Sequence, residues 1–139
     1  MSGFILVRDI MARNVKTVRT DDSVLSAVKK MIKFNIGSVI VTNNGKPIGI
    51  ITERNILEKV VAPRHDADTL HAKDIMSSPL ITVEENDAVE DAAKIMGRKT
   101  IKTLPVLGGD KLVGIITSSD IVRSSPQQIG ILEELLRIK

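Results

Sequence analysis

The chain has 139 residues, of which 42% are apolar, enough for one compact domain or for two small units folded together. Only 1% are aromatic and none is cysteine, which excludes base-stacking platforms for single-stranded nucleic acid, disulfides, thiolate zinc sites and thiol nucleophiles. The net charge of +3 is too small to imply binding of duplex nucleic acid by charge alone, and no apolar run reaches the roughly 18 residues of a membrane span.

The first half of the chain predicts a strand, a helix, two strands and a second helix. The predicted ranges are a strand at 15–18, a helix at 23–34, strands at 38–41 and 48–51, and a helix at 53–61. Apolar residues spaced three and four apart indicate the helix at 23–34, and Asp22 is its expected N-cap. The turn residues Asn43-Asn44-Gly45 predict a hairpin between the two later strands, and a polar linker follows at 62–71.

The second half predicts the same elements in the same order. The predicted ranges are a strand at 80–83, a helix at 88–99, strands at 104–107 and 112–116, and a helix at 118–124. Asp87 is the expected N-cap of the first helix, with Glu90 three residues later completing a capping box. Residues 126–139 predict a terminal amphipathic helix, whose apolar stripe must cover apolar surface of this chain or of a partner.

The two halves are copies of one another. An ungapped shift of 65 residues gives 18 identities over the 49 positions from Asp9 to Leu57, too many and too regular for chance. The longest matches join Asp9-Ile10-Met11 to Asp74-Ile75-Met76 and Gly49-Ile50-Ile51-Thr52 to Gly114-Ile115-Ile116-Thr117. A single copy would leave one sheet face uncovered, so we expect the two copies to pack sheet against sheet with pseudo-twofold symmetry. The expected fold class is α/β (α+β), built from two β-α-β-β-α repeats of which neither is stable alone.

Three features in this order resemble the cystathionine β-synthase (CBS) domain. They are the D-I-M opening, the h-P-V strand at Leu104-Pro105-Val106, and the pattern G-h-h-T-x-x-[DN] at 49–55 and 114–120. Two copies resemble the paired arrangement often called a Bateman module, over about residues 7–124. The expected organisation is repeat one at 7–61, a linker at 62–71, repeat two at 72–124, and a helix at 126–139 for dimer or intrachain packing. The resemblance also implies face-to-face dimers.

The pairs Thr52 with Asn55 and Thr117 with Asp120 admit two interpretations. Each Thr ends an apolar strand, and the polar residue lies in the first turn of a helix, as in a capping box. The same helix start offers N–H donors to an anion, and a carboxylate beside it can accept from two ribose hydroxyls. In CBS domains the Thr and Asp of this motif bind the ribose and phosphate of adenine nucleotides. Asn55 stands where Asp is usual and lacks its charge, so we expect the second copy to be the better site.

The resemblance implies further ligand contacts along the strands, for which the alternative is ordinary sheet packing. In the second repeat they are Ile81, Thr82, Lys102, Thr103, Leu104 and Pro105, and in the first repeat they are Lys16, Thr17, Ile36, Gly37 and Ser38. Each helix-to-strand corner carries bases and no acid, which makes Arg98 and Lys102 candidates for a phosphate, although solvated basic helix faces are also common. With so few aromatic residues, an adenine base would lie between aliphatic side chains and backbone.

No group of residues in the sequence predicts catalysis. His65 and His71 lie in the linker without the further ligands of a metal site, and no His–Asp arrangement or Walker pattern is present. We therefore expect a cytoplasmic, non-enzymatic regulatory module that requires no cofactor and no membrane. It would bind AMP, ADP or ATP in one or both clefts between the repeats and act through a homodimer or a regulated protein. The alternative is a nucleic-acid-binding or scaffold protein using the basic corners, against which stand the small net charge and the absence of a DNA-reading motif.

Overall fold

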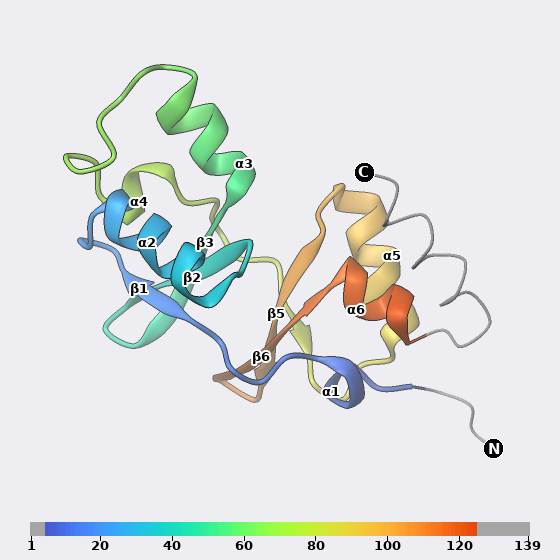
Figure 1. Cartoon of the computed structure of the whole chain (residues 1–139). Helices are drawn as coiled ribbons and strands as arrows, with labels where there is room; N and C mark the ends of the chain where they lie inside the picture. The colour runs from blue at the N-terminus through green and yellow to red at the C-terminus, as the bar shows by residue number, and fades with distance from the viewer. Residues whose placement is uncertain (1–4, 125–139) are drawn as a thin grey trace. The chain divides into compact units, whose positions relative to one another are not determined.

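A computed structural model describes residues 5–124 of the chain (Figure 1). Each repeat forms a three-stranded sheet in which the first two strands are parallel and the last two antiparallel. The strands are β1 (Thr17–Arg19), β2 (Ser38–Asn43) and β3 (Lys46–Thr52), then β4 (Val83–Glu84), β5 (Thr103–Gly108) and β6 (Lys111–Thr117). The α/β class and the β-α-β-β-α order of each repeat are confirmed. The helix predicted at 126–139 lies outside the described residues.

The longer helices occupy their predicted places. They are α2 (Val24–Phe34), α3 (Glu53–Ile56) continuing as the π-helix η1 (Leu57–Val61), α5 (Val89–Lys99) and α6 (Ser118–Arg123). Two further helices, α1 (Val7–Ile10) and α4 (Ala72–Ile75), begin the repeats and were not predicted, because one turn is too short for apolar periodicity. No helix in residues 5–124 is long and apolar enough to cross a membrane.

The predicted N-cap of α2, Asp22, is wrong by one residue. The cap is Ser23, whose Oγ accepts the N–H of Ser26 at 3.0 Å. Asp22 instead accepts the N–H of Arg19 at 2.7 Å and so closes the turn between β1 and α2. Since an acceptor side chain stands at both positions, the sequence alone does not decide which of the two caps the helix.

The second repeat shows the same shift. Ala88 occupies the N-cap position of α5 and offers no side-chain acceptor, while Asp87 accepts the N–H of Glu84 at 2.9 Å. The capping box predicted with Glu90 therefore does not form.

The compact units of the structure differ from the sequence repeats. The first-sheet unit is the continuous segment Val15–Ile81, and the second-sheet unit joins the described residues before Val15 to those after Ile81, that is 5–14 and 82–124. Each D-I-M segment therefore belongs to the unit that holds the sheet of the other repeat.

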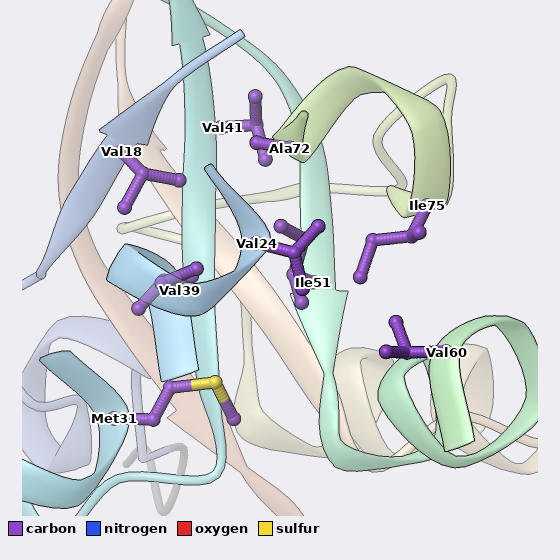
Figure 2. Close-up of a cluster of buried hydrophobic side chains, with 10 residues drawn as sticks. Val18, Val24, Met31, Val39, Val41, Ile51, Val60, Ala72 and Ile75 are labelled. Carbon is purple, nitrogen blue, oxygen red and sulfur yellow. The ribbon is translucent and has the colours of Figure 1, made fainter. Parts of the chain in front are cut away.

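The core of the first-sheet unit shows this exchange directly (Figure 2). Ala72 and Ile75 of α4, which open the second repeat, are buried against the strands of the first repeat. The fully assembled cluster consists of Val18, Val24, Ala27, Met31, Val39, Val41, Ile51, Val60, Ala72 and Ile75.

The second-sheet unit is completed in the same way by the start of the chain. Val7 and Met11, from the first repeat, pack with strand and helix residues of the second repeat. That cluster consists of Val7, Met11, Val83, Ala92, Met96, Leu104, Val106 and Ile116. In both units the apolar side chains of the opening segment are removed from water by packing with the strands and helices of the other repeat.

The aspartates of the two D-I-M motifs close the short helices in which they lie. Asp9 accepts the N–H of Leu6 at 2.9 Å and Asp74 accepts the N–H of His71 at 2.7 Å, which closes the single turns of α1 and α4. The carboxylate satisfies an N–H group that a helix start leaves without an intrahelical partner.

The methionines of the D-I-M motifs occupy the space beside the glycines of the two G-I-I-T stretches, which is why no larger residue fits there. A Cβ added to Gly114 would lie 2.5 Å from Sδ of Met11, and one added to Gly49 would lie 2.5 Å from Sδ of Met76. The two most similar stretches of the repeats are therefore contact partners, with the methionine of one repeat seated on the glycine of the other.

Candidate functional site

The predicted polar residues of the second repeat gather at one end of the β5–β6 hairpin. Thr103 pairs with Thr117 across the two strands, and the N–H of Ser118 donates to the carbonyl of Lys102 at 2.9 Å. Asp120 follows in the first turn of α6. Lys102, Thr103, Thr117 and Asp120 thus come together within the second-sheet unit.

Thr117 and Asp120 form a capping box. The N–H of Thr117 donates to Oδ2 of Asp120 at 2.9 Å, and the N–H of Asp120 donates to Oγ1 of Thr117 at 3.2 Å. The other carboxylate oxygen, Oδ1, accepts from Nη2 of Arg123 at 2.8 Å. The Asp120 side chain is 17% exposed and that of Arg123 is 63% exposed, so the carboxylate reaches the surface beside a solvated cation.

Thr52 and Asn55 form the equivalent box in the first-sheet unit. Oδ1 of Asn55 accepts the N–H of Thr52 at 2.8 Å and its hydroxyl at 3.0 Å, and the N–H of Asn55 donates to Oγ1 of Thr52 at 3.3 Å. The amide nitrogen Nδ2 donates to Oγ of Ser77 at 3.0 Å. Asn55 is only 7% exposed, so its side chain is a buried group with protein partners on both polar atoms.

Pro105 makes the first strand of the second repeat shorter than its counterpart. In the first-sheet unit the N–H of Ile40 donates to the carbonyl of Lys16 at 3.1 Å and extends the β1–β2 ladder. Pro105 stands at the position of Ile40 and has no N–H, so the equivalent bond to Ile81 cannot form. β4 accordingly begins at Val83, and Ile81 is 37% exposed.

The remaining predicted residues differ in exposure. In the second repeat, Leu104 and Pro105 are buried in the sheet, Thr82 is half-buried, and Arg98 and Lys102 are exposed. The buried pair therefore has side chains in the core, as the sheet-packing interpretation expects, and can offer a ligand little beyond backbone.

The first-repeat strand residues are largely engaged within their own unit. Nζ of Lys16 lies 4.0 Å from the ring centroid of Phe34, and the carbonyl of Thr17 accepts from Nζ of Lys30 at 2.7 Å. Ile36 and Ser38 are half-buried, and Gly37 is exposed, its carbonyl accepting the N–H of Glu53 at 3.2 Å.

Two residues that matter at these boxes, Ser77 and Arg123, were missed by the sequence reasoning. A signal for Ser77 exists in the alignment of the repeats, where it stands opposite Ala12 while Asn55 stands opposite Asp120. The two differences belong together, because Ser77 is the partner of Asn55. Within residues 5–124 no group of three or more His, Asp or Glu side chains is placed to hold a metal ion.

Comparison with known proteins identifies the family. The model of the CBS domain matches residues 7–62 and again residues 72–126. The chain belongs to the CBS-domain family. This CBS pair is 38% identical over 135 residues to the uncharacterized protein MK0525 of Methanopyrus kandleri, covering 96% of the chain and 69% of that relative. Proteins with CBS pairs are generally regulatory.

Two solved structures share the fold. The hexameric CBS-CP12 protein from bloom-forming cyanobacteria has a TM-score of 0.83 at 33% identity, over 91% of this chain and 75% of that one. The CBS domain pair of protein MJ0100, in complex with 5′-methylthioadenosine and S-adenosyl-L-methionine, has a TM-score of 0.79 at 30% identity, over 90% and 98%. CBS pairs similar to this chain thus include an oligomer and a complex with adenosine-containing ligands.

Proposed function

We propose that this CBS pair is a regulatory module that binds an adenosine-containing ligand, with AMP, ADP or ATP as the leading class, at the Thr117–Asp120 site. The observation that carries the proposal is the state of the Asp120 carboxylate. Its Oδ2 accepts the N–H of Thr117, while its Oδ1 accepts from the exposed Arg123 and has no other partner among the hydrogen bonds of the described residues. The complex of the MJ0100 pair with two adenosine derivatives supports the same ligand class.

A ribose hydroxyl of such a ligand would donate a hydrogen bond to Oδ1 of Asp120. An exposed ion pair such as Asp120–Arg123 contributes about 0–1 kcal/mol, so Arg123 can move aside at little cost. A hydrogen bond from a ribose hydroxyl to a carboxylate is charge-assisted and contributes about 1.5–3 kcal/mol. Exchanging Arg123 for a sugar hydroxyl replaces one charge-assisted hydrogen bond by another, water solvates the released arginine, and the capping bond to Thr117 holds the acceptor in place.

The adenine base suits the backbone of Ile81. Because Pro105 has no N–H, the carbonyl of Ile81 receives no ladder bond from that neighbour, whereas the carbonyl of Lys16 receives one from Ile40. The exocyclic amine of adenine is a donor of the right kind for this carbonyl. We propose that the base lies against the aliphatic side chain of Ile81 and the half-buried Thr82.

Phosphates, where the ligand has them, would meet Lys102 and Arg98. Lys102 is exposed, and its carbonyl is bonded to Ser118 at the start of α6, which puts its backbone beside the capping box. Arg98 is exposed in the last turn of α5. Replacing either cation should weaken the binding of ATP more than that of AMP, and the binding of AMP more than that of 5′-methylthioadenosine, because the electrostatic attraction to the cation rises with ligand charge.

The module is proposed to act by binding rather than by chemistry. The polar groups at the site are Thr117 and Asp120, bonded to each other in the capping box, and Arg123, bonded to Asp120, so the carboxylate is engaged in holding the site together. A ligand that binds one assembly state better than another shifts the chain toward that state. We propose self-association as the responding property, in keeping with the hexameric CBS-CP12 relative. Sedimentation velocity with and without ligand should show a ligand-dependent change in assembly.

Thermal unfolding with a panel of ligands tests the binding proposal. AMP, ADP, ATP, S-adenosylmethionine and 5′-methylthioadenosine are compared, with GMP as the base control. At about 100 times its Kd a ligand adds roughly 2.7 kcal/mol, which raises the Tm by several degrees. Asp120→Ala should weaken binding at least about tenfold, whereas Arg123→Ala should leave it unchanged or tighter. No shift with any adenosine ligand, or equal binding by Asp120→Ala, would show the proposal to be wrong.

A further inference from the structure

Residues 12 and 77 occupy equivalent positions, one residue after each D-I-M motif and 65 residues apart. Both are held by the same pair of backbone hydrogen bonds. Ala12 exchanges N–H···O=C bonds with Ile115 at 2.9 Å each, and Ser77 does so with Ile50 at 2.8 and 3.1 Å. The backbone therefore presents the two side chains in the same way to the adjoining capping box.

The side chains at these positions differ in one functional group. The hydroxyl of Ser77 lies 3.0 Å from Nδ2 of Asn55, while the methyl group of Ala12 has no polar atom to offer Asp120. The first-repeat box is consequently bonded to its neighbouring segment and is 7% exposed at Asn55. The second-repeat box has its free oxygen bonded to the solvated Arg123 instead.

We propose that residues 12 and 77 decide which repeat accepts the ligand: Ser77 closes the Asn55 box, and Ala12 leaves the Asp120 box open. The inference rests on the proposed function and adds that one chain binds one ligand. A ligand hydroxyl at Asn55 would have to displace the Ser77 hydroxyl, which the backbone pairing with Ile50 holds 3.0 Å from Nδ2, and it would gain only a neutral hydrogen bond in exchange. At Asp120 the displaced group is an arginine that water solvates at once.

The main experiment introduces the closing hydroxyl into the open site. Ala12→Ser places a donor against Oδ1 of Asp120, in competition with the ligand, and Ala12 is exposed so that the substitution is tolerated. We expect about five- to tenfold weaker binding of AMP or S-adenosylmethionine, whichever the wild type binds, with no loss of Tm. Ala93→Ser, at an exposed alanine of α5, is the matched control and should bind as the wild type does.

The converse experiment opens the closed site. Isothermal titration of the wild type should give one ligand per chain, and Asn55→Asp combined with Ser77→Ala should give two. If the wild type already binds two ligands with similar affinity, or if Ala12→Ser binds as tightly as Ala93→Ser, residues 12 and 77 do not select the site. In either case the proposed function would still stand.

A measurement without ligand separates the two proposals. Ser77→Ala removes the partner of a buried amide, so it should lower the Tm and speed amide exchange at Ile50, whose N–H donates to the carbonyl of residue 77. Unchanged exchange at Ile50 would overturn the closing role of Ser77 whatever the ligand result. Faster exchange at Ile50 in a chain whose wild type binds no ligand would instead show that the pair is a structural clasp and that the proposed function, with the selectivity built on it, is wrong.

Discussion

At the scale of single residues, Gly49 and Gly114 connect the two halves of the repeat pattern. Each glycine carries the methionine of the other repeat's D-I-M segment where a Cβ would stand. The residues that are identical in the two repeats therefore form the same methionine–glycine contact twice. Aligning the repeats identifies these methionines and glycines but does not show that they contact one another, because contacts between distant segments produce no periodicity in the sequence.

Gly114→Ala should destabilise the chain by about 1–3 kcal/mol, as overpacking of a filled site does. The added methyl group would lie 2.5 Å from Sδ of Met11 and 2.9 Å from the carbonyl oxygen of Ala12, and a bridging backbone cannot move away easily. Chemical denaturation measures the change. Gly97→Ala is the control, because the space beside this exposed glycine of α5 is open and the substitution should stabilise by about 0.5–1 kcal/mol. Equal effects of the two substitutions would contradict the packing argument.

The candidate site was partly predictable at this scale. The pairing of Thr117 with Asp120, and the weaker claim of Asn55, follow from residue type and spacing, and the structure shows that both boxes form. The contribution of Ser77 was not predictable, because 22 residues separate it from Asn55 and only the fold brings them together.

At the scale of elements, the two long helices start differently although they come from one repeat. α2 has the side-chain cap Ser23, and α5 has Ala88 at the same position with the same extended backbone. In α5 the N–H of Asp91 donates to the backbone carbonyl of Ala88 at 3.0 Å, where α2 uses a side-chain oxygen. The strands were predicted within a few residues, since alternation and turn residues define them locally. The starts of α2 and α5 were displaced by one residue, whereas those of α3 and α6 were predicted correctly.

Ala88→Ser should therefore stabilise the chain by about 0.5–1 kcal/mol by giving α5 the cap that α2 already has. Ser23→Ala, the reciprocal substitution, should destabilise by about 1 kcal/mol because the N–H of Ser26 loses its acceptor. Thermal unfolding of both variants gives the comparison. A lower Tm for Ala88→Ser would mean that the position tolerates no side-chain oxygen.

At the scale of the whole molecule, the compact units do not coincide with the two sequence repeats, because the opening segments α1 and α4 are exchanged between them. Each unit is built from the strands of one repeat and the opening turn of the other. The repeat and its order of elements could be predicted from periodicity, but which copy receives each opening segment could not, since the two sheets offer the same glycine.

Deleting residues 1–14 should therefore damage the second repeat rather than the first. The deletion removes Val7 and Met11 from the core around Leu104 and Ile116, so amide exchange should rise through β5 and β6. β2 and β3 should keep their protection, because their own opening partner, α4, is still present. Exchange that rises mainly in residues 38–52 would contradict the exchanged arrangement.

A backbone amide NMR titration of the wild-type chain with AMP and S-adenosylmethionine tests ligand binding at the Thr117–Asp120 site. We expect saturable shifts at Ser118, Asp120 and Lys102, accompanied by Thr82, with one ligand bound per chain. The equivalent amides at Gly37, Glu53 and Asn55 should stay in place, because Ser77 closes that box. Shifts centred on residues 37–55, or none at saturating concentrations of every adenosine ligand, would contradict ligand binding at the Thr117–Asp120 site.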